Sequence, residues 1–87
     1  MNTSDVYFSA ALMSLGFKLV NVDRADPRHM IFSFASASEN NLGDRAKSLE
    51  KAGFDAIKLQ WTNEELQVNA FKFAESIKRL KSIIHSN

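Results

Sequence analysis

The clearest hydrophobic pattern in the chain lies near its C-terminal end, over residues 69–85. Apolar residues recur there at spacings of four, three and four, which places them on one face of a helix. They are Phe73, Ile77, Leu80 and Ile84, continued by Ala70 and Ala74. Asn69 can cap this helix, since its side chain can accept a hydrogen bond from the N–H groups of the first turn. Burial of the apolar face must stabilise the helix, so we expect the rest of the chain to be organised around it.

A second helix is predicted near the N-terminus, over residues 4–15. Ser4 opens it, with Asp5 in the first turn, which is a typical N-terminal signature. Gly16 ends it, because glycine takes the left-handed conformation that follows a helix most easily. The predicted inward face consists of Tyr7, Ala11 and Leu15, with Phe8, Ala10 and Leu12 beside it.

Two strands are predicted next, at residues 17–23 (FKLVNVD) and 29–35. The polar stretch 24–28 contains the single proline and predicts a turn, so the strands should form an antiparallel hairpin. Met30, Phe32 and Phe34 share one face of the second strand. We expect the C-terminal helix to cover that face.

The sequence pattern in the middle of the chain is compatible with more than one secondary structure. Residues 36–41 predict a loop and residues 42–52 a helix, which Gly53 interrupts. Residues 54–61 fit a helix through Phe54, Ile57 and Trp61, and a strand through Ile57, Leu59 and Trp61; the helix is favoured. A turn at 62–64 and a short strand at 65–68 follow. The chain is thus predicted to be a single α+β domain over residues 1–87, a small antiparallel sheet packed with helices in the order α-β-β-α-β-α.

Composition and charge narrow the class of protein. The 87 residues suffice for one domain with a thin core, and they include no cysteine, so neither disulfides nor thiolate metal sites are expected. No apolar run approaches the ~20 residues of a membrane span. The start of the chain, MNTSDV, lacks the basic and apolar regions of a signal peptide, so a cytoplasmic location is expected.

Three stretches of the sequence carry a resemblance to a known family. They are Asp5-x-Tyr7-x-x-Ala10-Ala11-Leu12 running into Leu15-Gly16-Phe17-Lys18-Leu19-Val20, then Asn63-x-Glu65-Leu66-x-Val68, then Leu80-Lys81-Ser82-x-Ile84. Together they resemble a family of small uncharacterised domains carried by phages and prophages. The resemblance implies a viral or mobile-element setting, with the host-cell cytoplasm as the location, and it carries over no catalytic residue. The chain departs from the family over residues 36–60, which are longer than the family's single short helix.

Residue patterns that support catalysis are sparse. His29 and His85 lack metal-ligand spacing to another ligating residue, and the three glycines stand apart rather than forming a phosphate loop. The carboxylate pairs Asp23/Asp26 and Glu64/Glu65 lie on predicted turns, where such pairs are usually solvated. We therefore expect no enzyme activity, no cofactor and no metal.

Charge is concentrated in the C-terminal helix, although the whole chain carries only +1. From residue 70 onward there are four Lys or Arg and one Glu. The remainder of the chain has seven Lys or Arg and nine Asp or Glu. Such a basic face can contact phosphates, and Trp61 could stack on a base, although a solvated helix face and a core tryptophan are the simpler interpretations. The candidate nucleic-acid-binding residues are Lys78, Lys81 and His85, which line one stripe of the helix, and Lys72 and Arg79, which lie on a neighbouring stripe.

Two functional hypotheses follow from these patterns. The first is a non-enzymatic binding or accessory module of phage-like origin. It would act as a homodimer, because the strands and the first helix carry more apolar surface than a thin core can bury. The alternative is a small nucleic-acid-binding protein that uses the basic face of the C-terminal helix.

Overall fold

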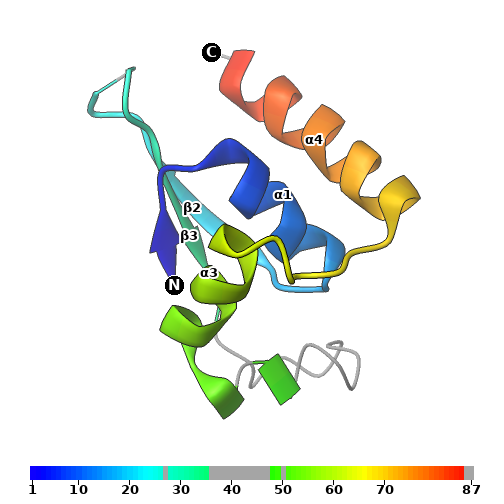
Figure 1. The fold of residues 1–87 in the computed structure, drawn as a ribbon. Helices are drawn as coiled ribbons and strands as arrows, with labels where there is room; N and C mark the ends of the chain where they lie inside the picture. The colour runs from blue at the N-terminus through cyan, green and yellow to red at the C-terminus, as the bar shows by residue number, and fades with distance from the viewer. Residues whose placement is uncertain (27, 36–47, 50, 86–87) are drawn as a thin grey trace.

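A computed structural model describes residues 1–26, 28–35, 48–49 and 51–85. Within them a three-stranded antiparallel sheet packs with helices, so the predicted α+β class is confirmed (Figure 1). The elements in chain order are β1 (Asn2–Thr3), α1 (Val6–Ser14), β2 (Leu19–Asp23), β3 (Ile31–Phe34), α3 (Phe54–Thr62) and α4 (Ala70–His85).

The predicted hairpin is present. Strand β2 pairs antiparallel with β3, with Val22 opposite Phe32 and Leu19 opposite Phe34. Residues 24–30 connect the two strands, a longer connection than the turn predicted over residues 24–28. An irregularity between Leu19 and Asn21 inserts Val20 as an extra residue, which is the signature of a β-bulge.

The third strand of the sheet is not the predicted one. Residues 65–69 have no regular structure, so the strand predicted over 65–68 is wrong. Strand β1 instead pairs antiparallel with β3 and puts β3 in the centre, in the order β1-β3-β2. The Met1 carbonyl accepts a 2.7 Å hydrogen bond from the Phe34 N–H, which extends this pairing. A two-residue strand has no alternation to detect, so no sequence pattern could have shown it.

Helix α1, not the C-terminal helix, lies at the centre of the fold. Its five consecutive residues Phe8, Ser9, Ala10, Ala11 and Leu12 are all at most 1 % exposed. A helix that is buried all round has neighbours on every side; here these are the sheet, α3 and α4 (Figure 1). The prediction that Tyr7 faces inward is wrong, since its side chain is 59 % exposed. Ser9 is buried in its place because its hydroxyl donates to the Asp5 carbonyl at 2.8 Å.

Both ends of α1 are fixed by local hydrogen bonds. Asp5, rather than the predicted Ser4, is the N-cap: its Oδ1 accepts from the N–H groups of Tyr7 and Phe8 at 2.9 and 3.0 Å. Gly16 ends the helix as predicted, with a left-handed φ of 105°. Its N–H donates to the Met13 carbonyl and that of Phe17 to Leu12, which together form a Schellman motif.

Helix α4 packs chiefly on α1 and not on the sheet, which corrects the prediction. Leu80 is fully buried, and Phe73, Ile77 and Ile84 pack partly buried against the core. Only the C-terminal end approaches the sheet, where Ile84 lines a small cavity together with Phe32. The predicted cap is confirmed, because Asn69 Oδ1 accepts a 3.0 Å hydrogen bond from the Lys72 N–H.

The middle of the chain is helical where the structure describes it. Residues 54–62 form α3, so the helical alternative is confirmed. The predicted loop at 36–41 and most of the predicted helix 42–52 lie outside the described residues, but Ser48, Leu49, Lys51 and Ala52 are helical. Gly53 interrupts the helix as predicted, with φ 95°.

Truncation of Leu80 tests whether α4 belongs to the core. Leu80→Ala should lower the free energy of unfolding by about 2–5 kcal/mol, because it leaves a cavity beside α1. Phe71→Ala on the same helix is the matched control: Phe71 is 71 % exposed, so its loss should cost no more than about 0.5 kcal/mol. Urea unfolding measures both, and a loss below 1 kcal/mol for Leu80→Ala would show that α4 is peripheral.

Candidate functional site

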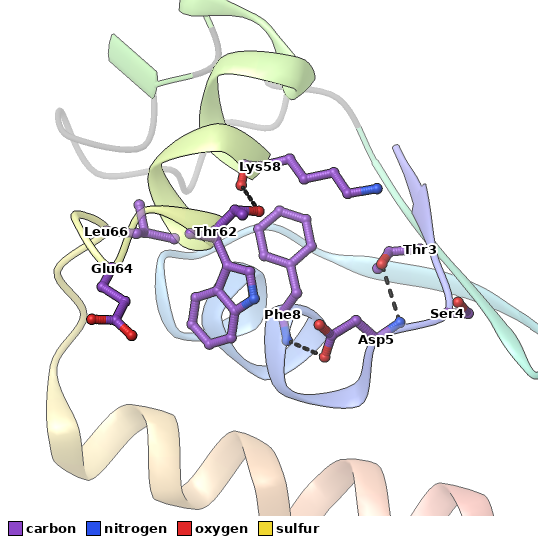
Figure 2. A pocket seen from close by; sticks show the side chains of 9 residues that line it. Thr3, Ser4, Asp5, Phe8, Lys58, Thr62, Glu64 and Leu66 are labelled. Atoms are coloured by element: carbon purple, nitrogen blue, oxygen red, sulfur yellow. Dashed lines mark hydrogen bonds between the residues drawn. The ribbon is translucent and has the colours of Figure 1, made fainter.

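An open cleft of about 750 Å³ lies between the start of α1 and the end of α3 (Figure 2). It joins residues 3–8 to residues 58–66, two segments that are distant in sequence. The lining residues are Thr3, Ser4, Asp5, Phe8, Lys58, Trp61, Thr62, Glu64 and Leu66. The volume falls within the ~300–1,000 Å³ typical of ligand pockets.

Aromatic rings form the base of the cleft. The ring centroids of Phe8 and Trp61 lie 5.8 Å apart at an interplanar angle of 37°, a tilted arrangement that favours ring contact. Phe8 makes the same 5.8 Å contact with Phe54, and Trp61 lies 6.4 Å from Phe73. Trp61 therefore belongs to both the core and the cleft, because it is only partly buried.

The side of the cleft formed by α1 is built by the N-cap. Thr3 Oγ1 accepts a 3.2 Å hydrogen bond from the Asp5 N–H, which fixes the chain where it enters the helix. Asp5 Oδ1 holds the two helix amides, whereas Oδ2 makes no hydrogen bond to a described residue. The carboxylate is thus held rigidly with one oxygen still able to accept.

The opposite side is formed by the end of α3. The Glu64 N–H donates to the Trp61 carbonyl at 3.1 Å and the Glu65 N–H to the Gln60 carbonyl at 2.8 Å, a second Schellman motif. Glu64 takes the left-handed position with φ 61°, and it is the one non-glycine residue with positive φ in the described part of the chain. An L side chain there costs about 1 kcal/mol relative to glycine.

Three charged groups line the cleft. Figure 2 shows the carboxylates of Glu64 and Asp5 on opposite sides, and the Lys58 side chain passing the Phe8 ring toward Thr3. Within the described residues none of the three forms an ion pair. The arrangement combines aromatic surface, hydroxyl groups and unpaired charges, which are the groups that orient a polar ligand.

The predicted basic residues are all exposed, but α4 does not bring them together. At roughly 100° per residue, Lys78, Lys81 and His85 lie within a sector of about 60° on the outer side of the helix. Arg79 lies about 160° from Lys81 around the axis, and Lys72 is on the same flank as Arg79. Arg79 lines a separate cavity with Met13, at the end of α1. The basic residues therefore form two separate stripes, as their spacing predicts.

Exposed Phe71 adds an aromatic ring to the outer face of α4. Phe71, Lys78 and His85 follow one another at seven-residue intervals, so they form a line along this face. Sequence reasoning did not include Phe71 in the candidate interface, although the spacing was visible.

The other predicted candidates have local roles. Asp23 Oδ1 accepts from the Ala25 N–H and Asp26 Oδ1 from the Arg28 N–H, both at 2.9 Å, so these carboxylates stabilise the turn. Both histidines are exposed. No group of three metal-ligating side chains occurs among the described residues.

The cleft itself was not predicted. Sequence analysis assigned Asp5 to helix initiation and left Lys58 out, since nothing in the sequence brings residues 3–8 beside residues 58–66. Glu64 was noted only as half of a carboxylate pair on a turn. The detectable signal was Glu64 directly after a helix end, where glycine is usual.

Comparison of the chain with protein-family models, curated proteins and solved structures found no match. The resemblance to phage and prophage domains therefore stays a prediction of the sequence. No described helix has the length and apolar character needed to cross a membrane.

Proposed function

We propose that the protein is a non-enzymatic binding module that holds a polar ligand or partner segment in the cleft between α1 and α3. The observation that carries the proposal is the cleft itself, in which rings of the core meet three charged groups that form no ion pair with the described residues. Binding sites combine apolar surface with a few fixed polar groups in this way. Phage-like origin and a cytoplasmic location remain part of the proposal and come from the sequence alone.

Peptide titration followed by amide NMR spectra tests this function. Three capped tetrapeptides, Gly-X-Gly-X with X as arginine, glutamate or leucine, sample the chemistry the cleft could take. At least one should shift the amide signals of Thr3, Asp5, Thr62 and Glu64 saturably. Thr62→Tyr should reduce the shifts because its ring fills the cleft, whereas Ser82→Tyr on the exposed face of α4 is the matched control. Absence of saturable shifts with all three peptides at millimolar concentration would contradict the proposal.

Nucleic-acid binding is the second candidate, and the outer face of α4 supports it. Phe71 could stack on a base while Lys78 and Lys81 contact phosphates. If so, replacing Lys78 and Lys81 with alanine should weaken binding evenly across sequences and flatten its salt dependence. The double variant Lys72→Ala/Arg79→Ala removes equal charge from the other flank and should have a smaller effect. Failure to bind any DNA or RNA at low salt removes this candidate.

A homodimer is proposed as the acting form. Strand β2 is an edge of the sheet, and its Val20 is 55 % exposed, so a second copy could pair there around a two-fold axis. The bulge at Val20 opposes such pairing, since bulges twist an edge away from partners. Light scattering should give twice the monomer mass of 9.8 kDa; a mass of 9.8 kDa that persists on concentration would exclude the dimer.

A further inference from the structure

We propose that the cleft binds the guanidinium group of an arginine side chain from a partner peptide, and that Glu64 occupies a strained backbone position for this purpose. The inference rests on the binding function proposed above and assigns it a ligand class. Three independent features of the cleft support it: its charge balance, its aromatic surface and the backbone of Glu64.

Charge balance favours a cation. Asp5 and Glu64 supply two carboxylates against the single ammonium of Lys58, which leaves a charge of −1 in the cleft. The two carboxylates lie on opposite sides of it, and the Lys58 chain extends toward Thr3 rather than between them (Figure 2). Asp5 Oδ2 and the Glu64 carboxylate accept no hydrogen bond from a described residue, so both can accept N–H groups of a ligand. Lys58 is left to face a carbonyl oxygen of the bound peptide.

Aromatic surface selects the kind of cation. A guanidinium is planar and weakly hydrated, so it stacks on an aromatic ring and still donates along its edges. Trp61, which is only partly buried, supplies the accessible ring, and the buried Phe8 packs against it; tryptophan is the best of the aromatic side chains for a cation–π contact. Carboxylates beside such a surface accept the edge N–H groups, which is the strong, charge-assisted form of hydrogen bond. A lysine ammonium has no flat surface to stack on the ring and no forked set of N–H donors to meet the carboxylates.

The backbone of Glu64 supplies the third observation. Helices α1 and α3 both end in Schellman motifs, and the left-handed position is Gly16 in the first and Glu64 in the second. At the end of α1 the chain uses the unstrained residue, although Gly16 borders a smaller cavity of about 350 Å³, to which it contributes no side chain. The chain keeps a strained side chain where that position borders the cleft. Strained backbone of this kind persists where the surrounding structure and a role maintain it.

Loss of the Glu64 charge tests the ligand class. The capped peptide Gly-Arg-Gly-Arg, followed through the emission of the single tryptophan, should bind Glu64→Gln about tenfold more weakly than the unchanged protein, the effect of one charge-assisted hydrogen bond. Asp5→Asn should act in the same direction while it preserves the helix cap. Glu65→Gln, a neutralised carboxylate one residue away that does not line the cleft, is the matched control and should bind normally. The same peptide with citrulline in place of arginine should bind weakly to all of them.

The strain at Glu64 has its own readout, which needs no ligand. Glu64→Ala removes the carboxylate and keeps the unfavourable backbone, whereas Glu64→Gly removes both. Glu64→Gly should therefore melt about 4–8 °C above Glu64→Ala, and above the unchanged protein, while it binds the arginine peptide poorly. A variant that gains stability and loses binding shows that the lost affinity does not come from misfolding.

The outcomes separate this inference from the function on which it rests. If Glu64→Gln binds the arginine peptide as tightly as the unchanged protein, the assignment of the ligand is overturned. If the acidic or the apolar peptide is the one that shifts the cleft amides, the ligand class is again overturned while the binding function stands. If Glu64→Gly is no more stable than Glu64→Ala, the backbone argument is overturned.

Discussion

Burial of the central residues of α1 on all sides is the constraint on which the rest of the structure depends. Five successive residues of one short helix are shielded from water, and this requires a neighbour on each side. The sheet, α3 and α4 supply those neighbours, and Phe8 contacts the rings of both Phe54 and Trp61. Alanines at positions 10 and 11 let the neighbours approach closely. A thin 87-residue domain thereby obtains one continuous core without disulfides.

The cleft follows from the same arrangement. Since Phe8 joins the core from the first turn of α1, the N-cap at Asp5 must lie beside the aromatic cluster. Trp61 sits in the last turn of α3, so the Schellman motif brings Glu64 to the opposite side. The two carboxylates are therefore positioned by helix ends, which are rigid and hydrogen-bonded, rather than by free loops. Such placement favours recognition of a fixed ligand geometry over adaptable contact.

Features that depend on neighbouring residues could be predicted from the sequence, whereas features that depend on contacts between distant segments could not. The hairpin, the Gly16 helix end, the Asn69 cap and the apolar face of α4 are local patterns, and each was recognised. The buried apolar residues of α1 were recognised except that Tyr7 was assigned to the inward face, because a helix that is apolar on most sides gives no single direction. The position of β1 and the contact of α4 with α1 depend on which distant segments meet. The cleft depends on the same information, so its residues could be named only after the fold was known.

Native-state hydrogen exchange tests the central role of α1 most directly. The account predicts that the amides of residues 9–12 exchange only through global unfolding, with an opening free energy equal to that from denaturant unfolding. The amides of residues 67–69, which lack regular structure, should exchange far faster. If the α1 amides exchanged through a smaller opening while the amides of α4 and the β2–β3 hairpin stayed protected, α1 would not be the element that holds the fold together.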